Sequence, residues 1–209
     1  MDTSLISFGQ LVARRVSSLD RGGDAAIGSL IDLTGDRLVR YSIAITRHQH
    51  DAEDAVQTVF VRLTDRPTHL TAADDPWAYL LRMVRNESLR VVARSSRMTL
   101  LRTLSDLVTR CPVDHLQNEE RYAEVWRCLR RLPAEQSEVV VLKIWEQMTF
   151  AQIAGVTDQS PDTVASRYRY AIDKLRRMLG PTDSETDNTT APKQTHSTSV
   201  IRQRTGGLL

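Results

Sequence analysis

Positively charged side chains are concentrated in two segments of this sequence, and both segments have the spacing of amphipathic helices. Residues 76–97 carry five arginines and a single acidic residue, Glu87. The cations of residues 161–179 are Arg167, Arg169, Lys174, Arg176 and Arg177. Guanidinium and ammonium groups bind phosphates, so such rows indicate a polyanionic partner, with nucleic acid as the first candidate.

The residue types that serve in catalysis or metal binding do not occur at spacings that would form such a site. The sequence has no glycine-rich phosphate loop, no zinc-binding spacing and no pairing of a nucleophile with a base. His48 and His50 would supply two metal ligands without a third, and we expect them to be surface turn residues. Cys111 and Cys128 are too far apart for a redox or metal pair, so we expect reduced thiols. The sequence therefore predicts a protein that is not an enzyme and needs no cofactor or metal.

The second basic segment is preceded by the signals of a helix-turn-helix. Thr149 with Gln152 forms a capping box for a short helix, and Ser160-Pro161 begins a longer one. In this motif the second helix enters the major groove, where its side chains reach base edges and phosphates. The residues placed to contact DNA are Asp162, Thr163, Ser166, Arg167, Arg169, Tyr170 and Lys174. By itself, however, a basic amphipathic helix is equally well explained as a solvated face.

The first half of the chain predicts further amphipathic helices. Apolar spacing indicates a short helix around residues 27–31, a second over 36–46 and a third beginning near Asp51. A loop over Arg66–Asp75 follows, and then the basic helix over 76–97. The third helix buries one apolar face and carries on its other face Glu53, Asp54, Gln57 and Thr58. A polar face of this kind is usually only solvated.

The second half separates from the first at a stretch of weak periodicity. Residues 98–120 contain Pro112 and predict a linker. A helix that begins near Tyr122 and is ended by Pro133 follows it, and then another over 135–146. After Gly180-Pro181 the tail is polar, and we expect it to be disordered. No segment alternates as a strand does. The prediction is an all-α protein of two small helical domains, 1–97 and 121–180, joined by the flexible linker 98–120 and followed by the tail 181–209.

Length and composition are those of a water-soluble globular protein. The chain has 209 residues, of which 41% are hydrophobic, and a net charge of +2. No stretch approaches the ~20 apolar residues that a membrane-spanning helix requires, and residues 1–15 do not have the pattern of a signal peptide. We therefore expect a cytoplasmic protein without membrane insertion.

Four stretches of the sequence resemble one family of transcription factors. "DAEDAVQTVFVRL" and "PWAYLLRMVRNESLR" are similar to regions 2.1 to 2.2 and 2.4 of extracytoplasmic-function (ECF) sigma factors of the sigma-70 family. "LPAEQSEVVVLKIWEQMTFAQIA" and "SPDTVASRYRYAIDKLRRML" resemble region 4 of the same family. The resemblance covers residues 24–179. It implies that residues 1–97 bind core RNA polymerase and recognise and melt the −10 promoter element, whereas residues 121–180 recognise the −35 element.

The resemblance also implies roles for individual residues. The residues expected to dock on the clamp helices of the largest polymerase subunit are Glu53, Asp54, Gln57, Thr58 and Val61. The loop Arg66–Asp75 corresponds to the loop that captures a flipped base, and the basic helix behind it would hold the opened DNA through Tyr79, Arg82, Arg85, Asn86 and Arg90. Trp77 could also stack on a base, but it lies on the apolar stripe and is better explained as core.

The sequence departs from the family pattern at three places. Thr157, Asp158 and Gln159 replace the usual apolar-Gly-apolar turn between the last two helices. Ala165 stands where a basic residue is frequent, and Thr58 where a Glu is frequent.

The expected function is that of a sigma factor that directs core RNA polymerase to promoters. The expected partners are the clamp helices and the flap of the polymerase, promoter DNA, and an anti-sigma factor or other regulator. The alternative is a helix-turn-helix regulator that binds operators tightly by itself without acting as a polymerase subunit. An enzyme acting on nucleic acid would need clustered carboxylates or a metal site, and neither is visible in the sequence.

Overall fold

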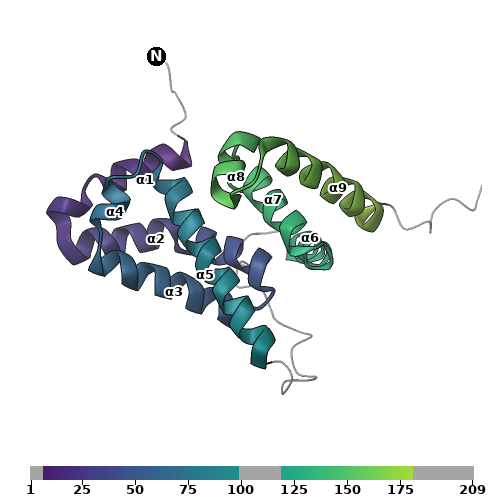
Figure 1. The fold of residues 1–209 in the computed structure, drawn as a ribbon, viewed down its shortest axis with the longest axis horizontal. Helices are drawn as coiled ribbons and strands as arrows, with labels where there is room; N and C mark the ends of the chain where they lie inside the picture. Colours follow the sequence, from purple (N-terminus) through teal and green to yellow (C-terminus); the bar gives the residue numbers. More distant parts are fainter. Residues whose placement is uncertain (1–6, 99–118, 181–209) are drawn as a thin grey trace, which may run out of the picture. The chain divides into compact units, whose positions relative to one another are not determined.

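The structure, a computed structural model, describes residues 7–98 and 119–180. Every helix described here belongs to one compact unit, Met1–Leu179. Within the described ranges all regular structure is α-helical, which confirms the all-α class (Figure 1). Most of the predicted linker and the whole predicted tail lie outside these ranges.

The first five helices form one group. They are α1 (Phe8–Val16), α2 (Leu19–Thr46), α3 (Gln49–Asp65), α4 (Thr68–Thr71) and α5 (Pro76–Met98). Helix α2 packs against α3 and α5, which also contact each other, and α1 packs against α2 and α5. The short α4 lies within the segment that the sequence predicts to be a loop. Helices α3 and α5 lie side by side in this arrangement (Figure 1).

Helix α2 corrects the prediction of two separate helices over residues 27–46. No proline interrupts this segment, and a glycine inside a helix costs only about 1 kcal/mol, which packing readily outweighs. The irregularity lies earlier, at Gly23, whose φ of 51° and ψ of −140° kink the helix. Helix α1 has no counterpart in the sequence prediction, because its buried stripe is short and consists of Val12 and Val16.

The core of this group comes from the apolar faces that the spacing predicts. Leu38 of α2, Val59 of α3, and Leu80 and Val84 of α5 are fully buried. Trp77 is also buried, with 4% of its surface exposed, and the ring of Phe8 packs edge-on against it at 4.9 Å. Trp77 is therefore a core residue, and Tyr79 is the aromatic residue of α5 that remains available for stacking.

The remaining helices form a second group: α6 (Glu119–Arg131), α7 (Ala134–Ile144), α8 (Phe150–Thr157) and α9 (Pro161–Leu179). Helix α9 packs against α6, α7 and α8 around Trp126, Leu142 and Ile153. Its own buried residues are Val164, Ala171 and Leu175, which recur at helical spacing. Ile144, the last residue of α7, is 46% exposed.

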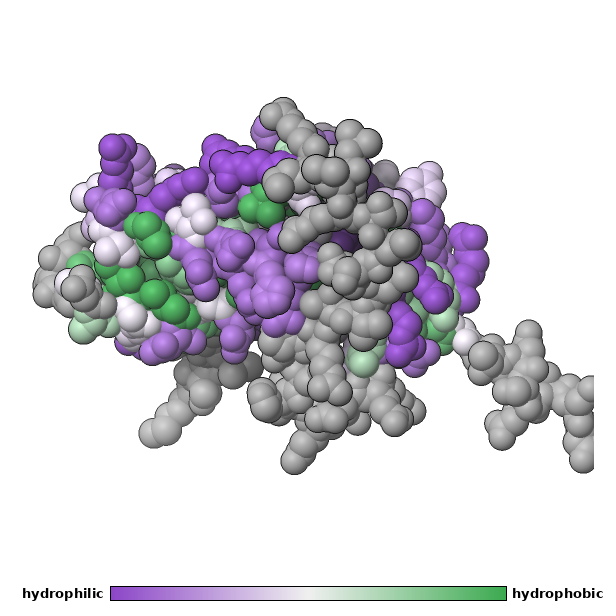
Figure 2. Space-filling model, turned by 90° about the horizontal axis from the view of Figure 1, so that it is seen from below, coloured by the Kyte–Doolittle hydropathy of each residue, from purple (hydrophilic) through white to green (hydrophobic). Residues whose placement is uncertain are grey.

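The face of the molecule seen in Figure 2 is mainly polar among the described residues. In Figure 2 hydrophilic residues cover most of the coloured middle of the face shown, whereas hydrophobic residues gather near its left end. Among the described residues no helix is both long and apolar enough to cross a membrane.

A buried carboxylate joins α3 to α5. Glu87 is only 2% exposed, and its Oε2 accepts hydrogen bonds from Arg62 Nη1 at 2.7 Å and Arg90 Nη1 at 3.0 Å. Burial alone would raise the pKa of Glu87, but the hydrogen bonds and charges of Arg90 and Arg62 outweigh it and lower this pKa below its usual value. The ionised carboxylate is therefore the form that the folded protein stabilises.

Glu87→Gln should reduce the loss of stability on acidification. A carboxyl whose pKa is lower in the folded state stabilises the fold above the unfolded pKa, and this contribution disappears as the pH falls through the lowered value. We expect wild type to lose stability as the pH falls below the usual glutamate value of 4.5, and the variant to be less stable at neutral pH but less acid-sensitive. Urea unfolding at several pH values measures this. Asp74→Asn, at an exposed carboxylate, is the control, and equal pH dependence of wild type and Glu87→Gln would contradict the assignment.

Candidate nucleic-acid and partner interfaces

The polar face of α3 borders a groove between α3 and α5. The groove has a volume of about 660 Å³, and four of the five residues assigned to core polymerase line it: Asp54, Gln57, Thr58 and Val61. Helix α5 contributes Val91 and Arg94 to the opposite wall. Val61 is 62% exposed, as the docking role expected for it requires. An exposed apolar side chain within a polar, hollowed face is a feature of partner-binding surfaces.

Glu53, the fifth residue, lies outside the set that lines the groove. Its Oε1 accepts a hydrogen bond from Gln49 Nε2 at 2.8 Å, and its other oxygen is 3.6 Å from His50 Nδ1. Neighbouring His48 caps α3, because its Nδ1 accepts a hydrogen bond from the backbone of Asp51. In residues 7–98 and 119–180 no group of three potential ligands could hold a metal.

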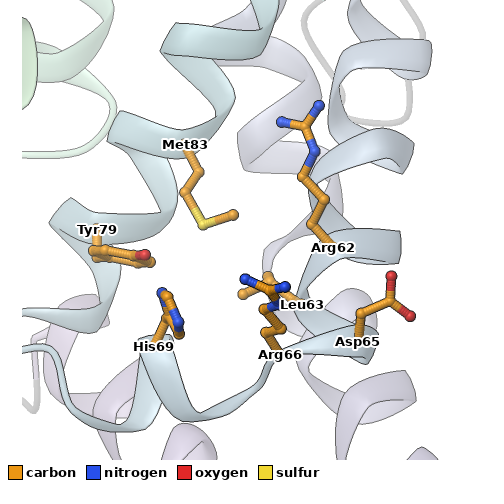
Figure 3. Close-up of a pocket in the computed structure, with 7 residues that line it drawn as sticks. All are labelled: Arg62, Leu63, Asp65, Arg66, His69, Tyr79 and Met83. Carbon is orange, nitrogen blue, oxygen red and sulfur yellow. The ribbon is translucent and has the colours of Figure 1, made fainter.

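A smaller pocket opens where α3, α4 and α5 meet. It has a volume of about 270 Å³ and is lined by Arg62, Leu63, Asp65, Arg66, His69, Tyr79 and Met83. Figure 3 shows Tyr79 and Met83 reaching into it from α5, His69 from α4, and Arg66 from the segment between α3 and α4. The sequence analysis includes Arg66 and His69 only as members of the predicted loop. Nothing in the sequence marks Met83 as a binding-site residue. A planar aromatic ring beside cationic and imidazole nitrogens is suited to a planar polar ligand.

The DNA-binding candidates of α5 differ in how accessible they are. Arg82, Asn86 and Arg90 are exposed, and with Tyr79 they follow one side of the helix at spacings of three and four residues. Arg85 is half-buried, and its Nε donates a hydrogen bond to Glu138 Oε1 of α7 at 2.7 Å. Arg82 donates to the backbone carbonyl of Gly155 in α8. Both arginines are therefore bound to the second group of helices.

The turn before α9 forms without the usual glycine. Asp158 adopts the left-handed conformation, with φ 56° and ψ 48°, which short polar side chains tolerate better than most residues. Thr157 is buried where the family has an apolar residue, and its hydroxyl donates to the carbonyl of Ile153 at 2.8 Å. The replacement residues at 157 and 158 therefore satisfy the requirements of the turn.

The candidate DNA-binding residues of α9 lie on two adjacent strips of the helix. Helical spacing places one strip at Thr163, Ser166, Arg167, Tyr170 and Lys174 and the other at Asp162 and Arg169. Tyr170 is 57% exposed, and the Arg169 guanidinium lies 5.6 Å from its ring centre. Arg167 forms an ion pair with Glu135 of α7 at 2.9 Å, and Lys174 donates to Gln136 Oε1 at 3.1 Å.

A buried polar cluster where α2 and α5 meet α7 was not anticipated from the sequence. The Tyr41 hydroxyl donates to Glu138 Oε1 at 2.7 Å, and Arg37 Nη1 donates to Glu146 Oε2 at 3.2 Å. Burial raises the pKa of Glu138 and of Glu146, against the opposing effect of nearby arginines. Burial, followed by the Glu138 charge, also raises the pKa of Tyr41, so that its hydroxyl remains a donor. One feature of the sequence could have indicated that Glu138 is buried: it stands directly before the apolar run at 139–142.

Comparisons with known proteins agree with this architecture. The family model described as Sigma-70 region 2 matches residues 30–98, and that described as Sigma-70, region 4 matches residues 122–175. The ECF RNA polymerase sigma factor SigE of Mycolicibacterium smegmatis is 28% identical over 175 residues, which cover 79% of this chain and 67% of that protein. The ECF RNA polymerase sigma factor BldN of Streptomyces coelicolor is 28% identical over 179 residues, covering 80% and 66%. The chain thus spans about two thirds of the length of these relatives.

Solved structures share the fold. The sigma factor RpoE in complex with the anti-sigma factor NepR, from Bartonella quintana, has a TM-score of 0.60 at 18% identity, covering 73% of this chain and 95% of that one. CnrH in complex with the cytosolic domain of CnrY has a TM-score of 0.52 at 22% identity, covering 83% and 97%.

Two helical groups in this order, one matching region 2 and the other region 4, define a sigma factor of the sigma-70 family. Within that family the chain belongs to the extracytoplasmic-function RNA polymerase sigma factors, as the sequence motifs predict.

Thr149→Ala should destabilise the helix-turn-helix by about 1 kcal/mol, the usual effect of removing a helix cap. The Thr149 hydroxyl oxygen accepts from the backbone of Gln152 at 3.2 Å, and the Gln152 side chain accepts from the backbone of Thr149 at 2.9 Å. Urea unfolding followed by circular dichroism measures the change. Thr64→Ala is the matched control, because Thr64 lies inside α3 and its hydroxyl only bonds back to the carbonyl of Phe60. Equal stability of Thr149→Ala and wild type would show that the cap is dispensable.

Proposed function

We propose that this sigma factor binds core RNA polymerase through α3 and reads the two promoter elements through α5 and α9. The observation that carries the proposal is the presence, in one chain, of a polar groove-lining face on α3 and of a capped helix-turn-helix. An operator-binding regulator needs the second feature but not the first. Adding the purified protein to bacterial core polymerase tests the proposal, and failure both to form a complex and to initiate at any genomic promoter would refute it.

The core-binding face is supported by the chemistry of its residues. Asp54 and Gln57 are exposed on α3, and Val61 provides an apolar contact beside them. Thr58, where the family frequently has a Glu, bonds through its hydroxyl to the carbonyl of Asp54 at 2.8 Å. This part of the face therefore carries one negative charge fewer than the family pattern, and we propose a correspondingly weaker electrostatic contact with the polymerase.

The pocket at α3, α4 and α5 is our proposed site for the flipped base of the −10 element. Its volume of about 270 Å³ lies just below the range of small-molecule sites, which begins at about 300 Å³, and suits a single base. Tyr79 offers a stacking surface, while Arg66 and His69 offer nitrogen donors for the base edge. Extruding a base costs a few kcal/mol, which stacking and hydrogen bonding in such a pocket offset.

Helix α9 is the proposed reader of the −35 element. Thr163, Ser166 and Tyr170 share one strip near its exposed side, with Lys174 behind them to hold a phosphate. To contact DNA, Arg167 must give up its ion pair with Glu135. The same guanidinium can then donate a charge-assisted hydrogen bond of similar strength to the DNA.

The remaining features of the proposal follow from family membership. We propose a cytoplasmic, non-catalytic subunit whose activity an anti-sigma protein controls, because the structural neighbour RpoE is bound to the anti-sigma factor NepR. An anti-sigma protein would cover the α3 face and the DNA-binding helices.

Gln57→Ala and Arg167→Ala should affect different steps. We expect Gln57→Ala to weaken core binding by about 1 kcal/mol or more, as for a contributing interface residue. Arg167→Ala should weaken recognition of the upstream promoter element by about 1–3 kcal/mol, the range for a base-contacting arginine. Titration of core polymerase and binding of −35 duplex by the holoenzyme measure the two steps, and each variant is the control for the other. If both substitutions lowered the same activity, the assignment of separate roles would be wrong.

Tyr79→Ala should weaken capture of the opened −10 strand by about 1–3 kcal/mol, the contribution of one base stacked on an aromatic ring. Tyr79→Phe keeps the ring and should bind nearly as wild type does. The measurement is binding of a single-stranded non-template −10 oligonucleotide to the holoenzyme, with core affinity determined in parallel. Equal loss in both variants would indicate that the hydroxyl, rather than the ring, makes the contact.

A further inference from the structure

One arginine of α3 borders two cavities. Arg62 lines the pocket where α3, α4 and α5 meet, and it also lines the groove between α3 and α5. In Figure 3 its guanidinium points away from Arg66 and Asp65. The side chain is 46% exposed. Arg62 therefore stands at the rim of the pocket, a position that helical spacing by itself does not indicate.

Glu87 of α5 brings a second arginine to the same place. Its Oε2 accepts hydrogen bonds from Arg62 Nη1 at 2.7 Å and from Arg90 Nη1 at 3.0 Å. Two guanidinium groups this close would otherwise repel each other, and the ionised carboxylate between them offsets that repulsion. Two cations around a single anion leave the cluster with an excess of positive charge.

The cluster presents hydrogen-bond donors at an accessible surface. A guanidinium carries several N–H donors, and Glu87 receives one from each arginine. The side chains of Arg62 and Arg90 are 46% and 58% exposed, whereas that of Glu87 is 2% exposed. An incoming anion therefore meets the arginines and not the acid. Guanidinium groups held in a fixed geometry are well suited to the oxygens of a phosphate.

Helical spacing aligns the cluster with the base pocket. Tyr79, Met83 and Glu87 recur every four residues and Arg90 follows three residues later, so these side chains lie along one side of α5. Tyr79 is the residue to which we assign stacking of the flipped base. Two helical turns, ~11 Å, separate Tyr79 from Glu87. The backbone of a strand whose base stacks on Tyr79 thus comes within reach of the cluster.

Neighbouring charges favour a polyanion on the pocket side of Arg62. Among the residues that line the groove, acids outnumber arginines, and Asp51 and Asp54 are two of these acids. Among the residues that line the pocket, arginines outnumber acids, since Arg62 and Arg66 accompany Asp65. A DNA strand is therefore attracted to the pocket side and repelled from the groove side.

We propose that Arg62 and Arg90 together bind the backbone phosphate beside the captured base, and that Glu87 is the residue that positions both arginines for it. Arg62 is then a DNA contact made by α3, the helix to which polymerase binding is otherwise assigned. Each arginine keeps one N–H on Glu87 and offers others to the phosphate, so no bond has to break before DNA binds. The inference rests on the −10 pocket proposed above and specifies how the adjoining phosphate is held.

Glu87→Gln separates positioning from simple charge. Removing a negative charge beside DNA would by itself strengthen the binding of a polyanion. Without the ionised acceptor, however, the two guanidiniums repel each other, so we expect the holoenzyme to bind a single-stranded −10 oligonucleotide about tenfold more weakly. The measurement is made at a temperature at which all variants are folded by circular dichroism, with core affinity determined in parallel.

Ser88→Ala is the control for the loss of a buried polar contact in α5. Its hydroxyl is hydrogen-bonded to Ser42 Oγ of α2 at 2.7 Å, one residue after Glu87. This variant should bind the oligonucleotide as wild type does, because the arginine cluster is unchanged.

Neutralising one phosphate at a time locates the contact. Methylphosphonate substitution at each position of the oligonucleotide removes one backbone charge and leaves the bases unchanged. The wild-type holoenzyme should lose about tenfold in affinity at the phosphate beside the captured base. Arg62→Gln should bind the unmodified strand about tenfold more weakly and lose nothing further when that phosphate is neutralised. Arg14→Gln, at an exposed position of α1, is the charge-matched control and should respond as wild type does.

Equal losses in wild type and Arg62→Gln at every neutralised position would overturn the phosphate contact. Binding by Glu87→Gln that is as tight as that of wild type, or tighter, would overturn the positioning role. Failure of the wild-type holoenzyme to bind the strand at all would refute the −10 pocket together with this inference. A strand whose binding depends on Tyr79 but on no phosphate contact of Arg62 would refute this inference alone.

Discussion

The apolar stripe of α5 is the constraint on which the positions of the candidate interfaces depend. Trp77, Leu80 and Val84 are buried against α1, α2 and α3, and this packing sets the rotation of the helix about its axis. Once that rotation is set, Tyr79 and Met83 must face the pocket, and Arg82 and Asn86 must face outward. The same packing places the α5 wall of the groove opposite the polar face of α3. The pocket, the groove and the basic surface thus lie on three sides of the same helix.

Two buried carboxylates of this protein differ in how their surroundings affect their charge. Glu87 connects α3 to α5 inside the first group, and the lowered pKa of this carboxyl means that its charge stabilises the fold. Glu138 has a raised pKa, because burial outweighs the contributions of Arg85 and Tyr41. The partners of Glu138 thus offset the cost of burying its charge only in part, whereas those of Glu87 more than offset it.

The helix-turn-helix shows how a motif persists when its usual residues are replaced. The turn requires a left-handed residue and a buried neighbour, and the family usually meets these needs with glycine and an apolar side chain. Here Asp158 supplies the left-handed conformation, and Thr157 is buried with its hydroxyl bonded to the preceding turn of α8. What the motif requires is a backbone conformation and a satisfied buried position, and more than one residue type provides them.

The sequence by itself determined the helical class, the family, most helices and the core face of each long one, because local spacing and capping residues encode these features directly. The core position of Trp77 was predicted in this way. Only the tertiary structure decided that Glu138 and Glu146 are buried, that Arg82 and Arg85 bind α8 and α7, and that Arg66, His69 and Met83 share a pocket with Tyr79. These features depend on pairs of residues far apart in the chain, and helical periodicity carries no information about which face of one helix meets which face of another.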